Sequence, residues 1–155
     1  MGPLLILKFG CVALTAYFYI RRFTRTPDAA RLGGLLYAFS GFSVYNIFFN
    51  HFHEPIIFFP LLLLALELLI TEKRPLCFAF MVAICAVVNY FFFFGMVVFC
   101  VIYYLVRVFM GAVEFKIKSF LMLALEAVLG LLLSAFLLIP SYMAISGNNR
   151  ITEFL

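Results

Sequence analysis

The chain has 155 residues, of which 67% are hydrophobic and 12% are charged. A water-soluble domain of this composition would have too little polar surface to cover itself, so soluble enzymes and soluble binding modules are excluded. The net charge of +4 needs no nucleic-acid partner, because its distribution along the chain has another explanation. Four cysteines lie in apolar stretches without a CxxC pair, which indicates buried free thiols: Cys11, Cys77, Cys85 and Cys100.

Basic residues gather in every second break between apolar stretches. Nine of the eleven Lys and Arg residues lie at 21–31, 73–74 and 107–118. The breaks in between, at 50–54 and around Asn89, contain neither Lys nor Arg. Basic residues near span ends are retained on the cytoplasmic side, and anionic inner-leaflet lipids add to the attraction. The alternation therefore predicts a multi-pass membrane protein with residues 50–54 on the extracytoplasmic side.

The apolar stretches predict an all-α polytopic transmembrane helical bundle of about six spans, at about 20 residues each. The first span is expected at 3–20 and runs inward. Thr26, Pro27 and Asp28 are typical of a helix start, so the second span is expected at 27–49, running outward. Pro55 is expected to begin the third span, which returns inward to residue 70.

The apolar run at 76–106 is too long for one ordinary span and too short for two. Asn89 lies near its middle, so we expect two short helices that meet at Asn89 and Tyr90 near the outer face, or a re-entrant pair shielded by protein or water. The last span is expected at 119–139, ended by Pro140. Residues 1–155 are expected to form a single transmembrane domain that is a fragment of a larger protein.

Lys8, Glu67 and Glu126 lie well inside predicted spans, where each needs a partner or a purpose. Lys8 is roughly 8 Å from the outer end at 1.5 Å per residue. Its ammonium either reaches outward to lipid headgroups or faces the bundle and holds an anion. Glu126 lies deeper, and an ion pair between Lys8 and Glu126 is the structural alternative. Glu67 is one turn from an inner loop, where Lys73, Arg74 or water would satisfy it.

The break at 50–54 contains the concentrated polar cluster of the outer side. Such a set could bind a divalent metal, act as a general base, hydrogen-bond a sugar, or be a hydrated loop without function. The pattern His-x-His-Glu lacks a second set of ligands at recognisable spacing, so no metal or other cofactor is predicted. These polar residues coincide with helix breaks, which favours a functional site over a hydrated loop without function. The residues concerned are Asn50, His51, His53 and Glu54, with Asn89 and Tyr90 in the same layer.

Five short segments in a fixed order carry a resemblance to a known family. They are Lys8 with Tyr17 and Arg21-Arg22, then residues 36–42, then an outer acid before Phe59-Pro60-Leu61-Leu62, then Asn89-Tyr90 with Gly95-Met96, and last Leu137-Leu138-Ile139-Pro140. No single segment is highly specific. Together and in this order, they resemble the bacterial YfhO-like membrane proteins over nearly the whole chain.

This resemblance implies a GT-C-type glycosyltransferase of the bacterial cell membrane. Such an enzyme transfers a sugar from a polyprenyl-phosphate donor to an extracytoplasmic cell-envelope acceptor such as a teichoic acid. A lipid-phosphate leaving group needs a cation at headgroup depth, for which Lys8 and Arg150 are candidates. The acceptor hydroxyl needs a base, for which Glu54 is the candidate catalytic residue. The family's catalytic acid is expected upstream of this chain, and the remaining candidates would line the substrate pocket: Asn50, His51, His53, Asn89 and Tyr90.

Two other classes of protein stay open at this point. Broken helices and intramembrane charges also mark the substrate pathways of transporters and flippases. The absence of an inverted repeat in the sequence argues mildly against a transporter. A non-catalytic membrane assembly subunit is the third interpretation.

Overall fold

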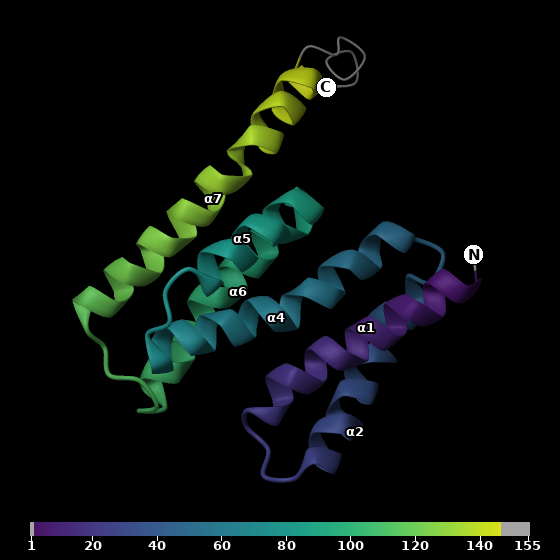
Figure 1. Cartoon of the computed structure of the whole chain (residues 1–155), viewed down its shortest axis with the longest axis horizontal. Coiled ribbons are helices and arrows are strands. Elements are labelled where there is room, and N and C mark those ends of the chain that lie inside the picture. Colours follow the sequence, from purple (N-terminus) through teal and green to yellow (C-terminus); the bar gives the residue numbers. More distant parts are fainter. Residues whose placement is uncertain (1, 147–155) are drawn as a thin grey trace.

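The structure is a computed structural model that describes residues 2–146. Every regular element in this range is helical, which confirms the all-α prediction (Figure 1). Four helices are long and apolar enough to cross a membrane, namely α1, most of α4, α6 and most of α7. The helices are α1 (Gly2–Arg21), α2 (Pro27–Ala38), α3 (Gly41–Tyr45), α4 (Asn50–Glu72), α5 (Cys77–Val88), α6 (Tyr90–Phe109) and α7 (Ile117–Ser146).

The predicted second span is not one helix, and the prediction of about six spans is not confirmed. Thr26 and Pro27 do start a helix, but α2 ends at Ala38 after 12 residues. At 1.5 Å per residue α2 is about 18 Å long, too short for a hydrocarbon core of about 30 Å. Ser40 then adopts an extended conformation (φ −60°, ψ 155°) and precedes the five residues of α3.

Two other prolines, Pro55 and Pro140, do not mark the helix boundaries that the sequence suggested. α4 begins at Asn50, ahead of Pro55, and α7 continues through Pro140 to Ser146. In lipid, backbone N–H and C=O groups without hydrogen-bond partners are costly. A membrane helix therefore continues through a proline, because the backbone groups on both sides of it stay hydrogen-bonded. The break at Asn89 is confirmed, but only α5 is short, since α6 has 20 residues.

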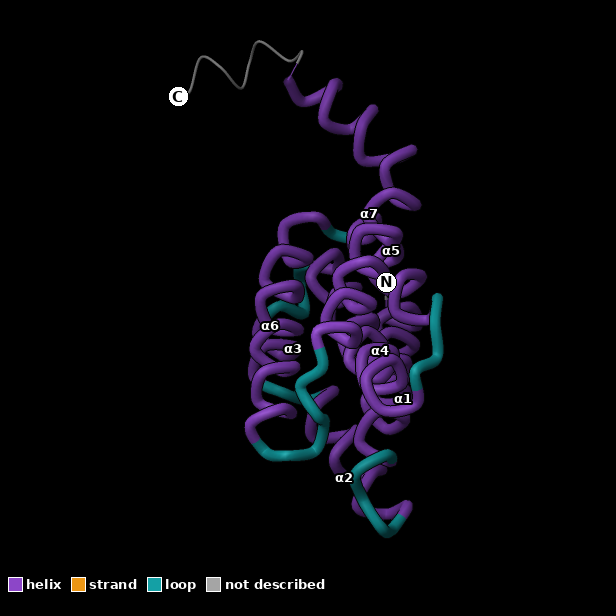
Figure 2. Tube along the Cα trace, turned by 90° about the vertical axis from the view of Figure 1, so that its left-hand side faces the viewer, coloured by secondary structure: helices purple, strands orange, loops and turns teal. Residues whose placement is uncertain are grey.

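α4 is the central helix of the bundle. In its apolar stretch 56% of the residues are buried, against 17% for α1 and 22% for both α6 and α7. α1 packs on one side of α4 and α2 packs on α1, while α5, α6 and α7 lie on the other side (Figure 1). The C-terminal part of α7 extends past the other helices (Figure 2). The core therefore lies between α4, α5 and α6, with a contribution from the start of α7.

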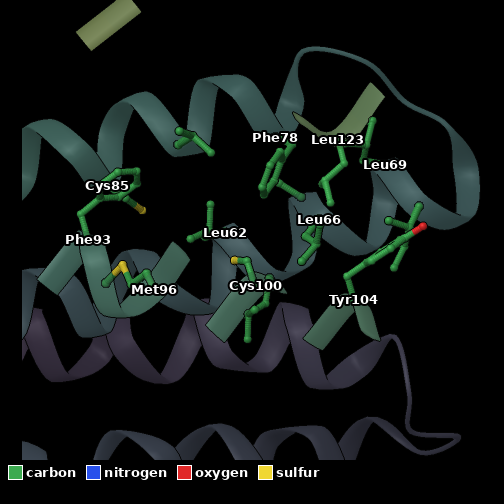
Figure 3. Close-up of a cluster of buried hydrophobic side chains, with 14 of the residues drawn as sticks. Leu62, Leu66, Leu69, Phe78, Cys85, Phe93, Met96, Cys100, Tyr104 and Leu123 are labelled. Atoms are coloured by element: carbon green, nitrogen blue, oxygen red, sulfur yellow. The ribbon is translucent and has the colours of Figure 1, made fainter. Parts of the chain in front are cut away.

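Large apolar side chains from these four helices fill that core (Figure 3). Leu62 and Leu66 of α4 face Phe78 of α5 and Tyr104 of α6. All four cysteines are free thiols, as predicted, but only two of them are buried: Cys85 and Cys100 are in the core, Cys11 is partly exposed and Cys77 is exposed.

Two glycines allow neighbouring helices to approach closely. A Cβ atom on Gly34 would lie 2.6 Å from the carbonyl oxygen of Ala13, across the contact between α1 and α2. A Cβ atom on Gly130 would lie 2.5 Å from the carbonyl oxygen of Ala79, across the contact between α5 and α7. Small residues at such contacts are typical of membrane helices, which gain stability from close packing.

The connections that carry the basic residues lie at one end of the bundle, where α1, α4 and α6 finish (Figure 1). We call this the basic end, formed by residues 21–26, 72–76 and 107–118. The starts of α1, α4 and α6 form the opposite end. The alternation of charge along the sequence is thus a separation of charge in space.

Candidate functional site

At the opposite end, Lys8 of α1 lies beside Glu54 of α4. Lys8 Nζ donates to Glu54 Oε1 over 3.3 Å, and the side chains are 14% and 43% exposed respectively. Both residues lie within about two turns of the start of their helices, so they share a depth. The alternative ion pair between Lys8 and Glu126 is wrong, because Lys8 pairs with Glu54 and Glu126 binds backbone N–H groups at the start of α5. The structure brings together the two residues predicted as phosphate contact and catalytic base.

Glu126 has a different partner, at the start of α5. Its carboxylate is buried and accepts hydrogen bonds from the backbone N–H groups of Leu76 at 2.9 Å and Ala79 at 3.3 Å. The first N–H groups of a helix have no partner within the helix, and a carboxylate stabilises them. Glu126 is therefore used to fasten α7 to α5.

His53 is fully buried and contacts α1 and α3. Its Nε2 lies 3.1 Å from the carbonyl oxygen of Ser43, and its ring centroid lies 5.4 Å from that of Phe9. That carbonyl is available because the N–H of Ile47 donates to Val44 instead. If Nε2 donates, Nδ1 is the acceptor nitrogen, and it has no partner among the described residues. His53 thus holds α3 against α4 and does not share the exposed face of Glu54.

The other candidates of the polar cluster are only partly placed. Asn50 and His51 form the start of α4, but the description of the structure does not extend to their side chains. Arg150 lies outside the described residues. Their predicted contacts with a substrate stay predictions.

Asn89 acts as the N-cap of α6. Its backbone is extended, and its Oδ1 accepts from the N–H groups of Phe91 at 3.2 Å and Phe92 at 3.3 Å. Asn is among the preferred residues at this position. Tyr90 is 67% exposed next to it. A cap accounts for Asn89 without a substrate, and its predicted role in a pocket stays a prediction.

An aromatic groove of about 260 Å³ lies on another face of α4, toward α2, α3 and α6. Phe52 and Ile56 line it, and each is two residues from Glu54, so they point to the opposite side of the helix. Tyr37 closes one wall, because its hydroxyl donates to the carbonyl oxygen of Ile56 over 3.2 Å. That carbonyl lacks a helical partner because Pro60 has no N–H. The groove and the Lys8–Glu54 pair are separate features.

The sequence analysis missed a buried cluster at the basic end. Glu67 is 1% exposed, accepts from the hydroxyl of Tyr103 at 2.8 Å and forms an ion pair with Arg107. The expectation that Lys73, Arg74 or water satisfies Glu67 is therefore wrong. A signal was present, since Tyr103 and Arg107 are four residues apart and share one face of a helix.

Within the described residues, no three His, Cys, Asp or Glu side chains gather closely enough to hold a metal ion. The apolar helices and the separation of charge between the two ends define a multi-pass membrane protein.

Residues 3–154 match the family described as bacterial membrane protein YfhO. The chain therefore belongs to this family and is a bacterial membrane protein, as the sequence motifs indicated. No curated protein and no solved structure matches the chain.

Proposed function

We propose that this chain is the central membrane part of a GT-C-type glycosyltransferase that uses a polyprenyl-phosphate-linked sugar. The acceptor would be an extracytoplasmic cell-envelope glycopolymer such as a teichoic acid. Membership of the YfhO family supports this class of protein. The observation that carries the proposal is the Lys8–Glu54 pair, a partly exposed carboxylate beside an ammonium, at the end away from the basic loops.

The pair supplies the two charges that sugar transfer from a lipid phosphate requires. The acceptor oxygen bonds to the anomeric carbon, the bond from that carbon to the phosphate oxygen breaks, and polyprenyl phosphate leaves. Glu54 would take the proton of the acceptor hydroxyl, while Lys8 would stabilise the charge that develops on the phosphate.

The remaining candidates would act around this pair. Asn50, His51 and Tyr90 are proposed to contact the sugar or the acceptor, and Arg150 is proposed as a second cation for the phosphate. For His53 and Asn89 the hydrogen bonds support positioning roles, because His53 bonds to α3 and Asn89 caps α6. This arrangement requires the end opposite the basic end to be extracytoplasmic.

The test is sugar transfer by the complete protein carrying Glu54→Gln or Lys8→Met. Removal of a general base lowers turnover by about 100-fold or more, so Glu54→Gln is expected to lose at least that much activity. Lys8→Met is expected to lower turnover and to weaken donor binding. Glu72→Gln is the matched control, because Glu72 is an ion-paired carboxylate at the basic end. Full activity of both test variants, with normal expression, would exclude the proposed site.

A transporter or flippase segment is the second candidate function. The division of one span into α2 and α3, and the short helix α5, are the observations that favour it. Discontinuous helices form substrate sites in several transporter folds. Reconstituted vesicles separate the two functions, since a flippase moves a lipid-linked sugar between leaflets without forming a glycosidic bond to an acceptor.

A further inference from the structure

At the basic end, the last turn of α4 and the first turn of α7 enclose a cavity of about 270 Å³. Two lysines and one serine line it together with three apolar residues. The polar lining is Lys73, Lys118 and Ser119, and the apolar lining is Leu69, Ile70 and Met122. The cavity thus combines positive charge with an apolar floor.

The positive charge of this cavity is not neutralised by the carboxylates around it. Glu72 is paired with two arginines, and Glu114 is paired with Lys116 at 2.7 Å. The pKa of Glu114 is lowered chiefly by the hydrogen bond from Lys116, with a smaller contribution from Lys73. Across residues 2–146, no carboxylate lies within ion-pair distance of Lys73 or Lys118.

The backbone around Lys73 is held in a defined conformation. Lys73 ends α4 with a left-handed conformation (φ 53°), and Leu76 is also left-handed (φ 71°). Such conformations are uncommon for residues with a side chain, and surrounding contacts must maintain them. Here the buried carboxylate of Glu126 binds the N–H of Leu76 over 2.9 Å. The connection from α4 to α5 therefore presents Lys73 from a constrained turn.

We infer that this cavity binds the headgroup phosphate of an anionic phospholipid such as phosphatidylglycerol. Basic pockets between membrane helices at the level of the headgroups attract anionic lipids. The three apolar residues of the floor would contact the start of an acyl chain, which a soluble phosphate does not have. The bound lipid would join the connection between α4 and α5 to the start of α7. The inference is independent of sugar transfer.

Native mass spectrometry of the complete protein, with phosphatidylglycerol added, tests the inference. Lys73→Gln/Lys118→Gln is expected to weaken lipid binding about tenfold or more, because two cations beside the phosphate are lost. Arg21→Gln/Arg25→Gln removes the same charge from the same end but not from the cavity, and it is expected to bind within about twofold of the unchanged protein. Equal weakening in both double variants would overturn the inference, since it would show general attraction to the basic end.

Two further ligands separate a lipid site from a soluble-phosphate site. Phosphatidylcholine should bind the unchanged protein more weakly than phosphatidylglycerol, and Lys73→Gln/Lys118→Gln should remove this preference. Glycerol phosphate should not displace the lipid. If no lipid preference exists, or if glycerol phosphate binds as tightly as phosphatidylglycerol, the inference is wrong. Unfolding temperatures of both double variants, measured alongside, show that the fold is intact.

Discussion

The two ends of the bundle use their carboxylates differently. At the basic end, Glu67 and Glu126 are 1% and 3% exposed, and each accepts two hydrogen bonds from other helices. At the opposite end, Glu54 is 43% exposed beside a single lysine. Buried, fully bonded carboxylates fasten helices together, whereas an accessible carboxylate can exchange its partner. The contrast indicates which acid is available for chemistry.

The ion pairs show the same difference. Six ion pairs form among the side chains that the structure describes: four include a residue of the basic end, a fifth joins Asp28 to Arg31 near the start of α2, and the sixth is the Lys8–Glu54 pair. A dense set of pairs thus restrains the connections at the basic end. Four changes would break or sharpen this comparison, beginning with the largest expected loss of stability.

Glu67→Gln or Arg107→Leu should destabilise the protein by about 3–5 kcal/mol, because each leaves a buried group without its partner. Unfolding in detergent measures the loss. The double variant Glu67→Leu/Arg107→Leu removes both charges and should recover most of the stability. A loss below about 1 kcal/mol in the single variants, the range of exposed pairs, would contradict a fastening role.

Gly130→Leu should cost about 1–3 kcal/mol, because the new side chain would overlap the backbone of Ala79 in α5. Gly95→Leu and Gly10→Leu are matched controls, since a Cβ at either position meets nothing within 4 Å. The three unfolding temperatures give the comparison. Equal effects at all three positions would show that helix propensity, and not close packing, decides stability.

Asn89→Ala should cost about 1 kcal/mol, the usual effect of losing an N-cap side chain. Asn89→Ser retains a capping oxygen and should restore most of that stability. Sugar transfer by the same two variants separates the cap from a substrate contact. If Asn89→Ser is stable but inactive, Asn89 contacts substrate, and the purely positioning role is wrong.

Glu54→Gln should change stability by less than about 1 kcal/mol, since the Glu54 carboxylate in this ion pair is partly exposed and not buried. This is the smallest expected effect on unfolding and, in sugar transfer, the largest. Stability and sugar transfer, measured on the same variant, separate a catalytic role of Glu54 from a structural one. A loss of several kcal/mol would place Glu54 with Glu67 as a fastening residue.

Local signals in the sequence were sufficient for the helix starts and the break in the middle. Thr26 and Pro27 begin α2, and Asn89 separates α5 from α6, because a cap or a fixed φ acts on neighbouring residues. The charge alternation likewise gave the basic end. The end of α2 at Ala38 and the continuation of α7 through Pro140 depend on contacts and on the lipid environment, which local patterns do not contain.

Partner choice could not be obtained from depth alone. Depth along a helix axis follows from residue number, but the direction of a side chain around the axis depends on which helix is adjacent. Lys8 and Glu54 lie at the same depth, but only the packing of α1 on α4 makes them partners. The Glu67–Arg107 pair joins residues 40 positions apart, and only the packing of α6 on α4 reveals it.

Sidedness is the claim on which the proposed chemistry depends, and labelling of single cysteines tests it most directly. In a variant without the four native cysteines, Phe48→Cys and Lys116→Cys place exposed thiols at the two ends, as Phe48 is 89% exposed and the Lys116 side chain 61%. A membrane-impermeant maleimide applied to intact cells should label position 48, and position 116 only after permeabilisation. The reverse pattern would put Glu54 in the cytoplasm and contradict the account.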